Sequence, residues 1–185
     1  MDNGISLLQN INFGIKKNEI YKLVVSDNFL GRMIINLALG LTNPSAGKIT
    51  YDGHLMSAIF SGIDALYPQL TAYENLLYEN KIHLQERNSD AIIQGFLTLG
   101  ELENTGDFLV STYSMGMRKR LSVLKSILAT PDLLILERPF DDIDSESSRV
   151  ICKLLEEVST YSTIMVVSTN KCSIQSLCTE IIDIA

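Results

Sequence analysis

Runs of apolar residues separated by polar ones divide this chain into strand-like and helix-like stretches. Three runs rich in leucine and β-branched residues, at 19–25, 133–136 and 163–167, predict buried strands, and the last is expected to be the final strand. A looser alternation at 7–15 and a short run at 48–51 predict two further strands. Polar turns bound these runs, which is typical of strands joined by loops.

Helical spacing of apolar residues marks the stretches between those runs. Residues 32–41, 89–100, 117–128 and 146–158 are expected to form amphipathic helices. Thr71, followed three residues later by Glu74, has the pattern of a capping box and predicts the start of another helix. Residues 26–31 are expected to be a loop, and residues 101–107 an acidic linker exposed to solvent.

Composition and charge restrict the classes of function. The chain has 185 residues, of which 46% are hydrophobic and 20% charged, enough for one globular domain with a core. A net charge of −7 argues against a general nucleic-acid binder, although Arg118, Lys119 and Arg120 form a local basic patch. The three cysteines lack metal-site spacing and favour a reduced compartment. No signal peptide is recognised, and no apolar run is long enough to cross a bilayer, so a role at a membrane requires another chain.

The strand, loop and helix expected at 20–41 have the arrangement of a phosphate-binding loop. A working loop combines converging backbone N–H groups at glycines, a lysine for the outer phosphates and a Ser or Thr for magnesium. The corresponding stretch here contains Ser26, Asp27, Asn28, Gly31, Arg32 and Met33. Arg32 is either a phosphate-binding cation or a solvated arginine in the first turn of the helix.

Residues 113–144 resemble the signature motif and Walker B motif of ABC-transporter ATPases. The resemblance rests on Tyr113-Ser114-Met115-Gly116-Met117-Arg118-Lys119-Arg120-Leu121, on the strand at 133–136, and on the flanks at 17–21, 39–47 and 66–76. It covers nearly the whole chain and implies an α/β fold: a P-loop NTPase-like, three-layer domain with a mainly parallel core sheet and a small helical subdomain. The implied single domain, 1–185, has its α/β core at about 1–68 and 131–185 and its helical subdomain at about 69–130. The family's first strand, which carries an adenine-stacking aromatic residue, is missing from the match.

The resemblance places altered residues at the elements that serve a domain's own nucleotide. Gly31 falls at the phosphate-loop lysine, with Arg32 and Met33 at the two hydroxyl positions. Gly62 falls at the Q-loop glutamine. The remaining positions are Glu137 for the magnesium-contacting Asp, Arg138 for the catalytic Glu and Asn170 for the switch histidine. ATP and Mg²⁺ are implied by the family, with Glu137 as the candidate metal ligand; a guanidinium such as that of Arg138 cannot act as a general base.

The elements that the family offers to a partner's nucleotide are largely kept, at Ser114, Gly116 and Asp144. Family domains pair head to tail, so the implied partners are a second ABC ATPase domain, identical or different, and a transmembrane permease. The implied location is cytoplasmic, peripheral to the cytoplasmic membrane. The favoured hypothesis is a catalytically degenerate transporter subunit that lends its signature motif to a partner ATPase. One alternative is a weakly active ATPase that uses Arg32 and Glu137. Another is a non-catalytic interaction protein or a truncated remnant.

Overall fold

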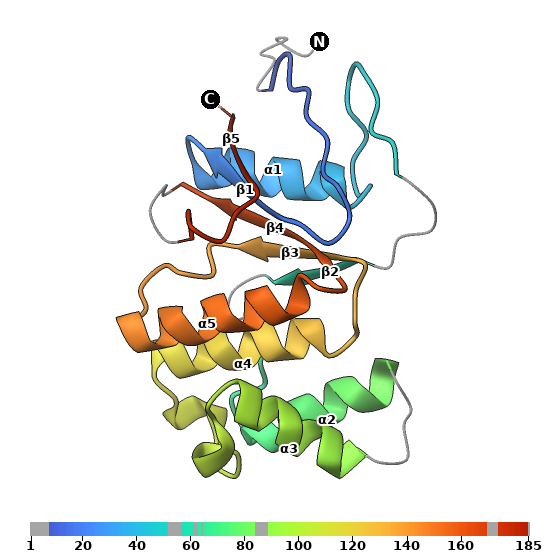
Figure 1. Cartoon of the computed structure of the whole chain (residues 1–185). Helices are drawn as coiled ribbons and strands as arrows, with labels where there is room; N and C mark the ends of the chain where they lie inside the picture. The colour runs from blue at the N-terminus through green and yellow to red at the C-terminus, as the bar shows by residue number, and fades with distance from the viewer. Residues whose placement is uncertain are drawn as a thin grey trace.

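A five-stranded parallel sheet forms the middle layer of the protein (Figure 1). The computed structural model describes residues 8–51, 57–60, 63, 65–83, 89–169 and 174–184. The strand order is β2-β3-β4-β1-β5, and every described pairing is parallel. The strands are β1 Ile20–Val25, β2 Ser57–Phe60, β3 Leu133–Glu137, β4 Thr163–Ser168 and β5 Glu180–Ile184. The carboxyl ends of parallel strands lie at one edge, which is where α/β folds place their ligands.

Helices cover both faces of the sheet. They are α1 Asn28–Ala38, α2 Ala72–His83, α3 Ser89–Leu99, α4 Met115–Ile127 and α5 Ser145–Val158, with short 3₁₀ turns at Glu103–Thr105 and Val110–Thr112. Figure 1 shows α1 on one face and α4 with α5 on the other, while α2 and α3 lie beyond α4, away from the sheet. This arrangement confirms the predicted three-layer α/β fold.

The apolar runs predicted as strands are buried because the sheet is covered on both sides. In β3, Leu134 and Leu136 belong to the cluster under α4 and α5, whereas Leu133 and Ile135 belong to the cluster under α1. Successive side chains of a strand point to opposite faces, so a strand in the middle layer needs apolar residues at consecutive positions. The predictions for β1, β3 and β4 are therefore confirmed.

The predicted capping box at the start of α2 is also confirmed. The Glu74 backbone N–H donates to Thr71 Oγ1 at 3.1 Å, and the Thr71 backbone N–H donates to Glu74 Oε2 at 2.8 Å. Two backbone donors that the helix leaves without partners are thus satisfied by two side chains.

Two predicted strands are wrong, and two strands of the structure, β2 and β5, are not among the predicted ones. Residues 8–15 and 48–51 form no strand, and no backbone hydrogen bond pairs residues 9–15 or 48–51 with another described part of the chain. The run at 163–167 is not the final strand, since β5 pairs with β1 beyond it. β5 is mostly exposed, and its sequence therefore lacks the continuous apolar run of the central strands. Among the described residues, no helix is both long enough and apolar enough to cross a membrane.

Candidate functional site

The junction between β1 and α1 is a tight capped turn. The helix begins at Asn28, so the loop predicted for 26–31 is wrong from residue 28 onward. Asp27 is the N-cap, and its Oδ1 accepts a hydrogen bond from the Leu30 backbone N–H at 2.9 Å. The resemblance places Val25, Asn28 and Leu30 where the family loop has glycines. Without those glycines the backbone is less able to form a wide loop, and the aspartate cap favours a helix from residue 28. Ser26 bonds only weakly to Asp27 Oδ2, at 3.4 Å.

Asp27 therefore occupies the position where a helix N-terminus attracts an anion. The free N–H groups and the dipole at a helix start favour negative charge. Here the side chain of the preceding residue supplies that charge, and the Asp27 carbonyl also accepts from the Gly31 N–H at 3.2 Å. A phosphate at this end of α1 would meet a carboxylate in place of open backbone donors.

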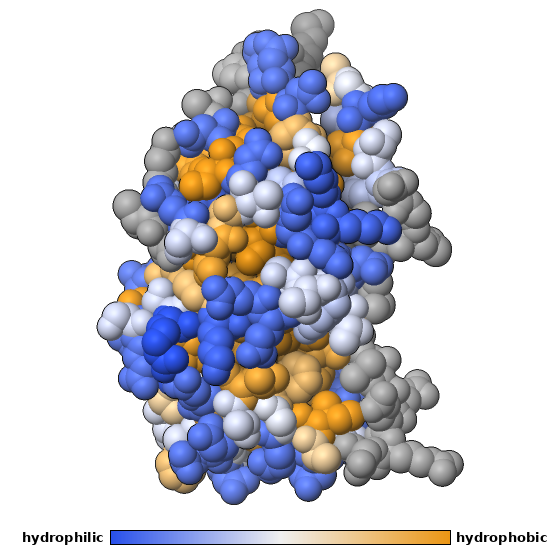
Figure 2. Space-filling model, in the orientation of Figure 1, coloured by the Kyte–Doolittle hydropathy of each residue, from blue (hydrophilic) through white to orange (hydrophobic). Residues whose placement is uncertain are grey.

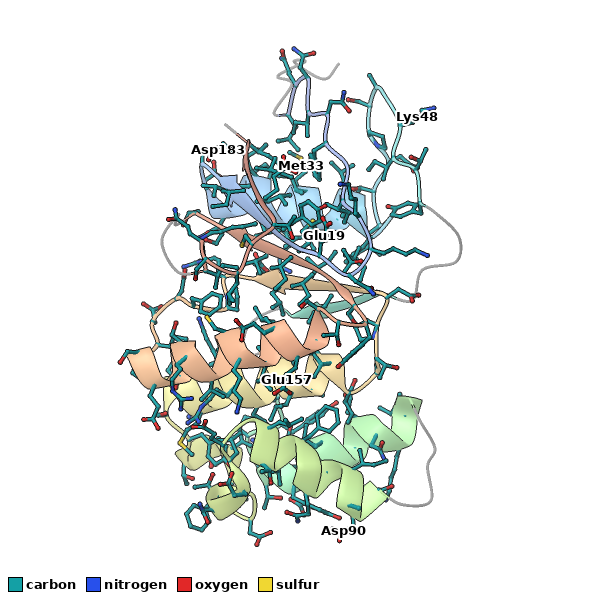
Figure 3. The ribbon with its side chains drawn as sticks, viewed as in Figure 1. Glu19, Met33, Lys48, Asp90, Glu157 and Asp183 are labelled. Atoms are coloured by element: carbon teal, nitrogen blue, oxygen red, sulfur yellow. The ribbon has the colours of Figure 1, made fainter. Side chains whose placement is uncertain are left out.

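Gly31 and Met33 serve packing of α1 on the sheet. A Cβ at Gly31 would lie 3.3 Å from Val167 Cγ1 and 3.4 Å from Val25 Cγ2, so the glycine permits close approach of helix and strands. Met33 is partly buried against the same cluster, and Figure 3 shows it on α1. Neither residue supplies the cation or the hydroxyl group that the family has at these positions.

Arg32 and Glu137 meet across the junction. The distance between Arg32 Nη2 and Glu137 Oε2 is 2.8 Å, with the arginine side chain 49% exposed and the glutamate side chain 14% exposed. The sequence offers Arg32 as a candidate phosphate-binding cation and Glu137 as a candidate magnesium ligand. In this structure the two charges neutralise each other.

Arg138, which follows β3, is held by contacts within the chain itself. Its φ is 51°, a left-handed conformation that is uncommon for a non-glycine residue. Its N–H donates to Val167 O at 2.9 Å, its Nε pairs with Asp141 Oδ2, and its carbonyl accepts from Lys119 Nζ at 3.1 Å. Lys119 also donates to the Asp141 carbonyl. The Arg138 side chain is thus engaged with Asp141, and not with Glu137.

Lys119 thereby joins α4 to the loop between β3 and α5. The lysine is 7% exposed, and burial is the main reason that its pKa is lowered. Arg120 is also buried and donates to the carbonyls of Gly100 and Glu101, while Arg118 donates to the Ser111 carbonyl. The basic triplet is therefore mainly a set of donors to loop carbonyls, which corrects its prediction as a local basic patch.

The N-terminal ends of α4 and α5 lie side by side at this edge of the fold (Figure 1). Ser114 is exposed and is the N-cap of α4, with its Oγ accepting from the Met117 N–H at 3.2 Å. Asp144 is the N-cap of α5, with Oδ1 accepting from the Ser147 N–H at 2.7 Å and Oδ2 from Ser147 Oγ at 3.1 Å. These bonds, the backbone N–H of Ser147 first, lower the pKa of Asp144.

Gly116 fits tightly between these two helix ends. A Cβ on Gly116 would lie 2.1 Å from Ser147 Oγ and 2.7 Å from Asp144 Oδ2, so any other residue must displace the α5 cap. The structure thus brings Asp144 against the turn that carries Ser114 and Gly116, although some thirty residues separate them in the sequence. The contact between Gly116 and Ser147 is tertiary, and Ser147 carried no sequence signal for it.

The residues at the β1–α1 junction do not fit ATP and Mg²⁺ in the way the family loop would. A magnesium triphosphate needs several convergent N–H donors, a cation for the outer phosphates and oxygen ligands for the metal. The junction instead presents the Asp27 carboxylate and a neutralised Arg32–Glu137 pair. Within the described part of the chain, no group of three or more His, Cys, Asp or Glu residues could hold a metal ion. Gly62 and Asn170 lie outside the described residues.

Comparison with known proteins gives consistent matches. The model of the family described as ABC transporter matches residues 8–141. The ABC transporter ATP-binding protein YybJ of Bacillus subtilis is 31% identical over 183 residues, covering 94% of this chain and 83% of YybJ. The Nod factor export ATP-binding protein I of Rhizobium etli is 26% identical over 171 residues, covering 86% of this chain. That match covers 54% of the Rhizobium protein, so this chain spans about half of its length.

A solved structure shares the fold. It is a chain of a metal-chelate type ABC transporter in an inward-facing conformation, with a TM-score of 0.80 and 15% sequence identity. The match covers 94% of this chain and 71% of the other. At this identity the likeness establishes the common architecture and nothing about the cargo.

Proposed function

This chain belongs to the ABC transporter family of ATP-binding domains, and from that premise we propose that it is a transporter subunit that lends the N-terminal ends of α4 and α5 to the nucleotide of a second ATPase domain. Its own β1–α1 junction binds ATP weakly or not at all. The observation that carries this proposal is the contrast between the two anion positions at the same edge. The start of α1 is capped by Asp27 and flanked by the Arg32–Glu137 pair, whereas the start of α4 presents an exposed serine.

The loss of ATP-binding free energy at the β1–α1 junction can be estimated from the residues that differ from the family's phosphate loop. Hydrogen bonds to charged groups contribute about 1.5–3 kcal/mol each. A phosphate placed at α1 would lose several of these bonds, would face Asp27, and would have to break the pair between Arg32 and Glu137. Arg138 offers no proton acceptor where the family has its catalytic glutamate. Weak binding and absent turnover follow from the same set of residues.

The start of α4 retains what a helix needs to bind a partner's phosphate. The first turn has its free N–H groups, and Ser114 Oγ accepts one of them, which leaves its hydroxyl hydrogen without an acceptor among the described residues. That hydrogen and the helix dipole both favour an anion. Gly116 is weaker evidence for a phosphate-binding role, because its close packing against Ser147 would require a glycine even without a ligand. Ser114 is therefore the residue on which the proposal depends.

We further propose that the chain attaches to a membrane through a permease, and that the permease contacts the exposed aromatic pair Tyr67 and Tyr78. Their ring centroids are 5.2 Å apart in an edge-to-face arrangement, and they are 43% and 47% exposed. Lys125 Nζ lies 5.0 Å from the Tyr67 ring centroid and 3.2 Å from Glu79 Oε2. These contacts restrain the position of the Tyr67 ring. Rigid, half-exposed aromatic residues are favoured anchors of protein interfaces.

Calorimetric titration of the isolated chain with ATP and Mg²⁺ tests the proposal. We expect no saturable binding at micromolar nucleotide and no steady phosphate release.

Micromolar affinity with turnover would instead support a slow ATPase, for which Arg32 must leave Glu137 and bind the phosphates. In that case Arg32→Ala should abolish binding, with the exposed Arg149→Ala as the matched control. A chain that neither binds ATP nor joins a permease in membranes would be an interaction protein without a transport role.

A further inference from the structure

A cleft of about 630 Å³ opens on the α1 side of the sheet, at the edge opposite the site described above. Its floor includes Leu133 and Thr163, the first residues of β3 and β4, and the carboxyl-terminal half of α1. The apolar lining includes Ile11, Phe13, Ile34, Leu37, Ile49 and Met165. This volume is in the range of ligand-binding pockets, so the cleft can hold a substantial occupant.

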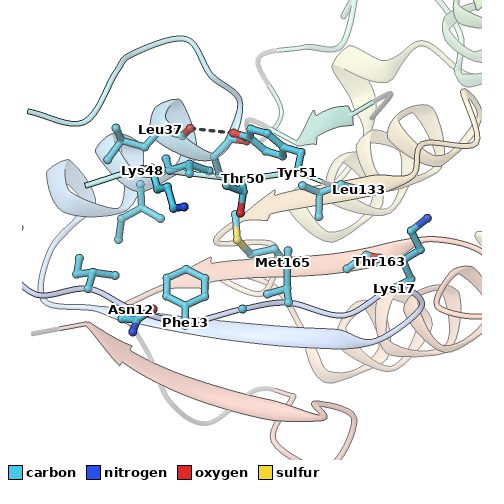
Figure 4. Close-up of a pocket in the computed structure, with 16 residues that line it drawn as sticks. Asn12, Phe13, Lys17, Leu37, Lys48, Thr50, Tyr51, Leu133, Thr163 and Met165 are labelled. Atoms are coloured by element: carbon cyan, nitrogen blue, oxygen red, sulfur yellow. Dashed lines mark hydrogen bonds between the residues drawn. The ribbon is translucent and has the colours of Figure 1, made fainter. Parts of the chain in front are cut away.

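Two extended chain segments form opposite walls of the cleft. Figure 4 shows Phe13, from residues 8–17, on one side and Tyr51, from residues 48–51, on the other. Both walls leave apolar side chains partly in water: Phe13 is 38% exposed and Tyr51 44%. Figure 2 shows apolar surface in the upper part of the molecule, where these segments run. Apolar side chains exposed around a cleft indicate a binding site for another molecule.

The backbone of both walls is free to pair. Within the described part of the chain, no residue donates to or accepts from the backbone of 9–15 or 48–51. Both segments have sequences that predict strands, yet neither is paired as one. Buried backbone groups must be satisfied, and an edge with unpaired groups is a template for another strand.

We propose that this cleft receives an extended strand of a partner polypeptide, which pairs through its backbone with residues 11–15 on one side and 48–51 on the other. A strand presents alternate side chains to the floor, so the occupant carries apolar residues at every second position. Unlike a lipid or another small amphiphile, a polypeptide supplies donors and acceptors to both walls.

The charge of the cleft adds a further requirement. Its charged lining residues are Lys17 and Lys48, and neither forms an ion pair with another residue that the structure describes. Two cations at the cleft of a chain with net charge −7 favour an acidic residue in the occupant. The cleft is remote from the nucleotide edge, so this inference does not depend on the proposed role in ATP binding.

Selection of a displayed library of random short peptides on the full chain tests the inference. We expect enriched peptides to alternate apolar with polar residues and to contain an acidic residue. Their affinity should fall about tenfold or more with Phe13→Glu, which places a carboxylate in the apolar wall, and by less with Lys48→Glu. Leu41→Glu, at an exposed leucine outside the cleft lining, should leave the affinity unchanged.

Hydrogen exchange of the complex distinguishes strand pairing from simple apolar contact. The amides of residues 11–15 and 49–51 should exchange more slowly when an enriched peptide is bound. Peptides that bind without this protection, or no enrichment that depends on Phe13 or Lys48, would overturn the inference. Saturable binding of dodecanoate in place of any peptide would also overturn it, because the cleft would then be a site for an anionic amphiphile.

Discussion

Arg32 of α1 and Glu137 at the end of β3 form an ion pair, with 2.8 Å between Nη2 and Oε2. The pair connects the two elements whose family counterparts hold phosphate and magnesium. Glu137 is the more buried partner, with 14% of its side chain exposed, so loss of Arg32 would leave the less solvated of the two groups without its partner. The charges of Arg32 and Glu137 are therefore neutralised within the chain, without a bound ligand.

A double-mutant cycle should measure this coupling. With Arg32→Ala, Glu137→Ala and both together, we expect an interaction of about 0.5–1 kcal/mol, because solvent reaches the half-exposed arginine and screens the pair. Urea unfolding at low and high salt gives the measurement, and salt should reduce the coupling. The same cycle on the more exposed Arg149–Glu101 pair should give a smaller value. A coupling indistinguishable from zero would show that the pair does not persist in solution.

The fold could be read from the sequence where burial fixes the pattern. The strands at 133–136 and 163–167 are covered on both faces, so their residues must be apolar, and the run predicts the strand. The segments at 8–15 and 48–51 alternate in the same way as strands. Pairing depends on a neighbour that the local pattern does not reveal, which is why both predictions failed.

The sequence indicates the candidate site residues one by one, but not how they are arranged. The resemblance named Arg32, Glu137 and Gly116, and the structure gives their partners. That Arg32 faces Glu137, and that Gly116 lies against Ser147, are tertiary contacts between distant segments. The Asp27 cap had a local signal, an aspartate just before an apolar helical stretch, and it could have moved the predicted helix start to residue 28.

Substitution of Gly116 should be costly. Gly116→Ala places a Cβ 2.1 Å from Ser147 Oγ, and we expect a loss of about 1–3 kcal/mol in the free energy of unfolding. Gly95→Ala is the matched control, since a Cβ there would meet nothing within 4 Å beyond its chain neighbours and the backbone of its own helix. In the middle of α3 this change should stabilise the protein by about 0.5–1 kcal/mol. Adding Ser147→Gly to Gly116→Ala should recover part of the loss. Equal effects at the two glycines would contradict this packing.

The lowered pKa of Asp144 predicts a stability change in acid. The folded carboxylate has a pKa below its ordinary value of 3.8, chiefly because Ser147 donates its backbone N–H to it. Its contribution is therefore complete above pH 3.8 and is lost as the pH falls through the lower folded pKa. Asp144→Asn keeps a capping side chain but cannot titrate. The stability difference between wild type and this variant should be constant near neutral pH and shrink below pH 3.8, as followed by thermal unfolding.

The aromatic surface should be needed for the permease and not for the fold. We expect Tyr78→Ala to reduce retention on membrane vesicles that contain the permease by about tenfold, because half-exposed aromatic anchors carry much of an interface's affinity. Loss of the Tyr67–Tyr78 contact should cost the isolated chain only about 0.5–1.5 kcal/mol. Tyr161→Ala, at a tyrosine 49% exposed after α5, is the control and should keep full retention. Equal retention of both variants would place the permease contact elsewhere.

Substitutions of Ser114 can distinguish its role as the N-cap of α4 from its proposed role in binding a partner's phosphate. Ser114→Asp keeps an N-cap oxygen for the Met117 N–H and suits the helix dipole, so the isolated chain should remain as stable as wild type. In the assembled transporter its carboxylate would repel the phosphate, and ATP turnover by the partner domain should fall at least about tenfold. Ser114→Gly, which costs a cap only a few tenths of a kcal/mol, removes the hydroxyl without adding charge and should have the smaller effect on turnover. Steady-state phosphate release from purified wild-type and variant transporters gives the measurement. Unchanged turnover with Ser114→Asp would mean that the start of α4 faces no nucleotide, and the lending role would be wrong even if this chain binds no ATP of its own.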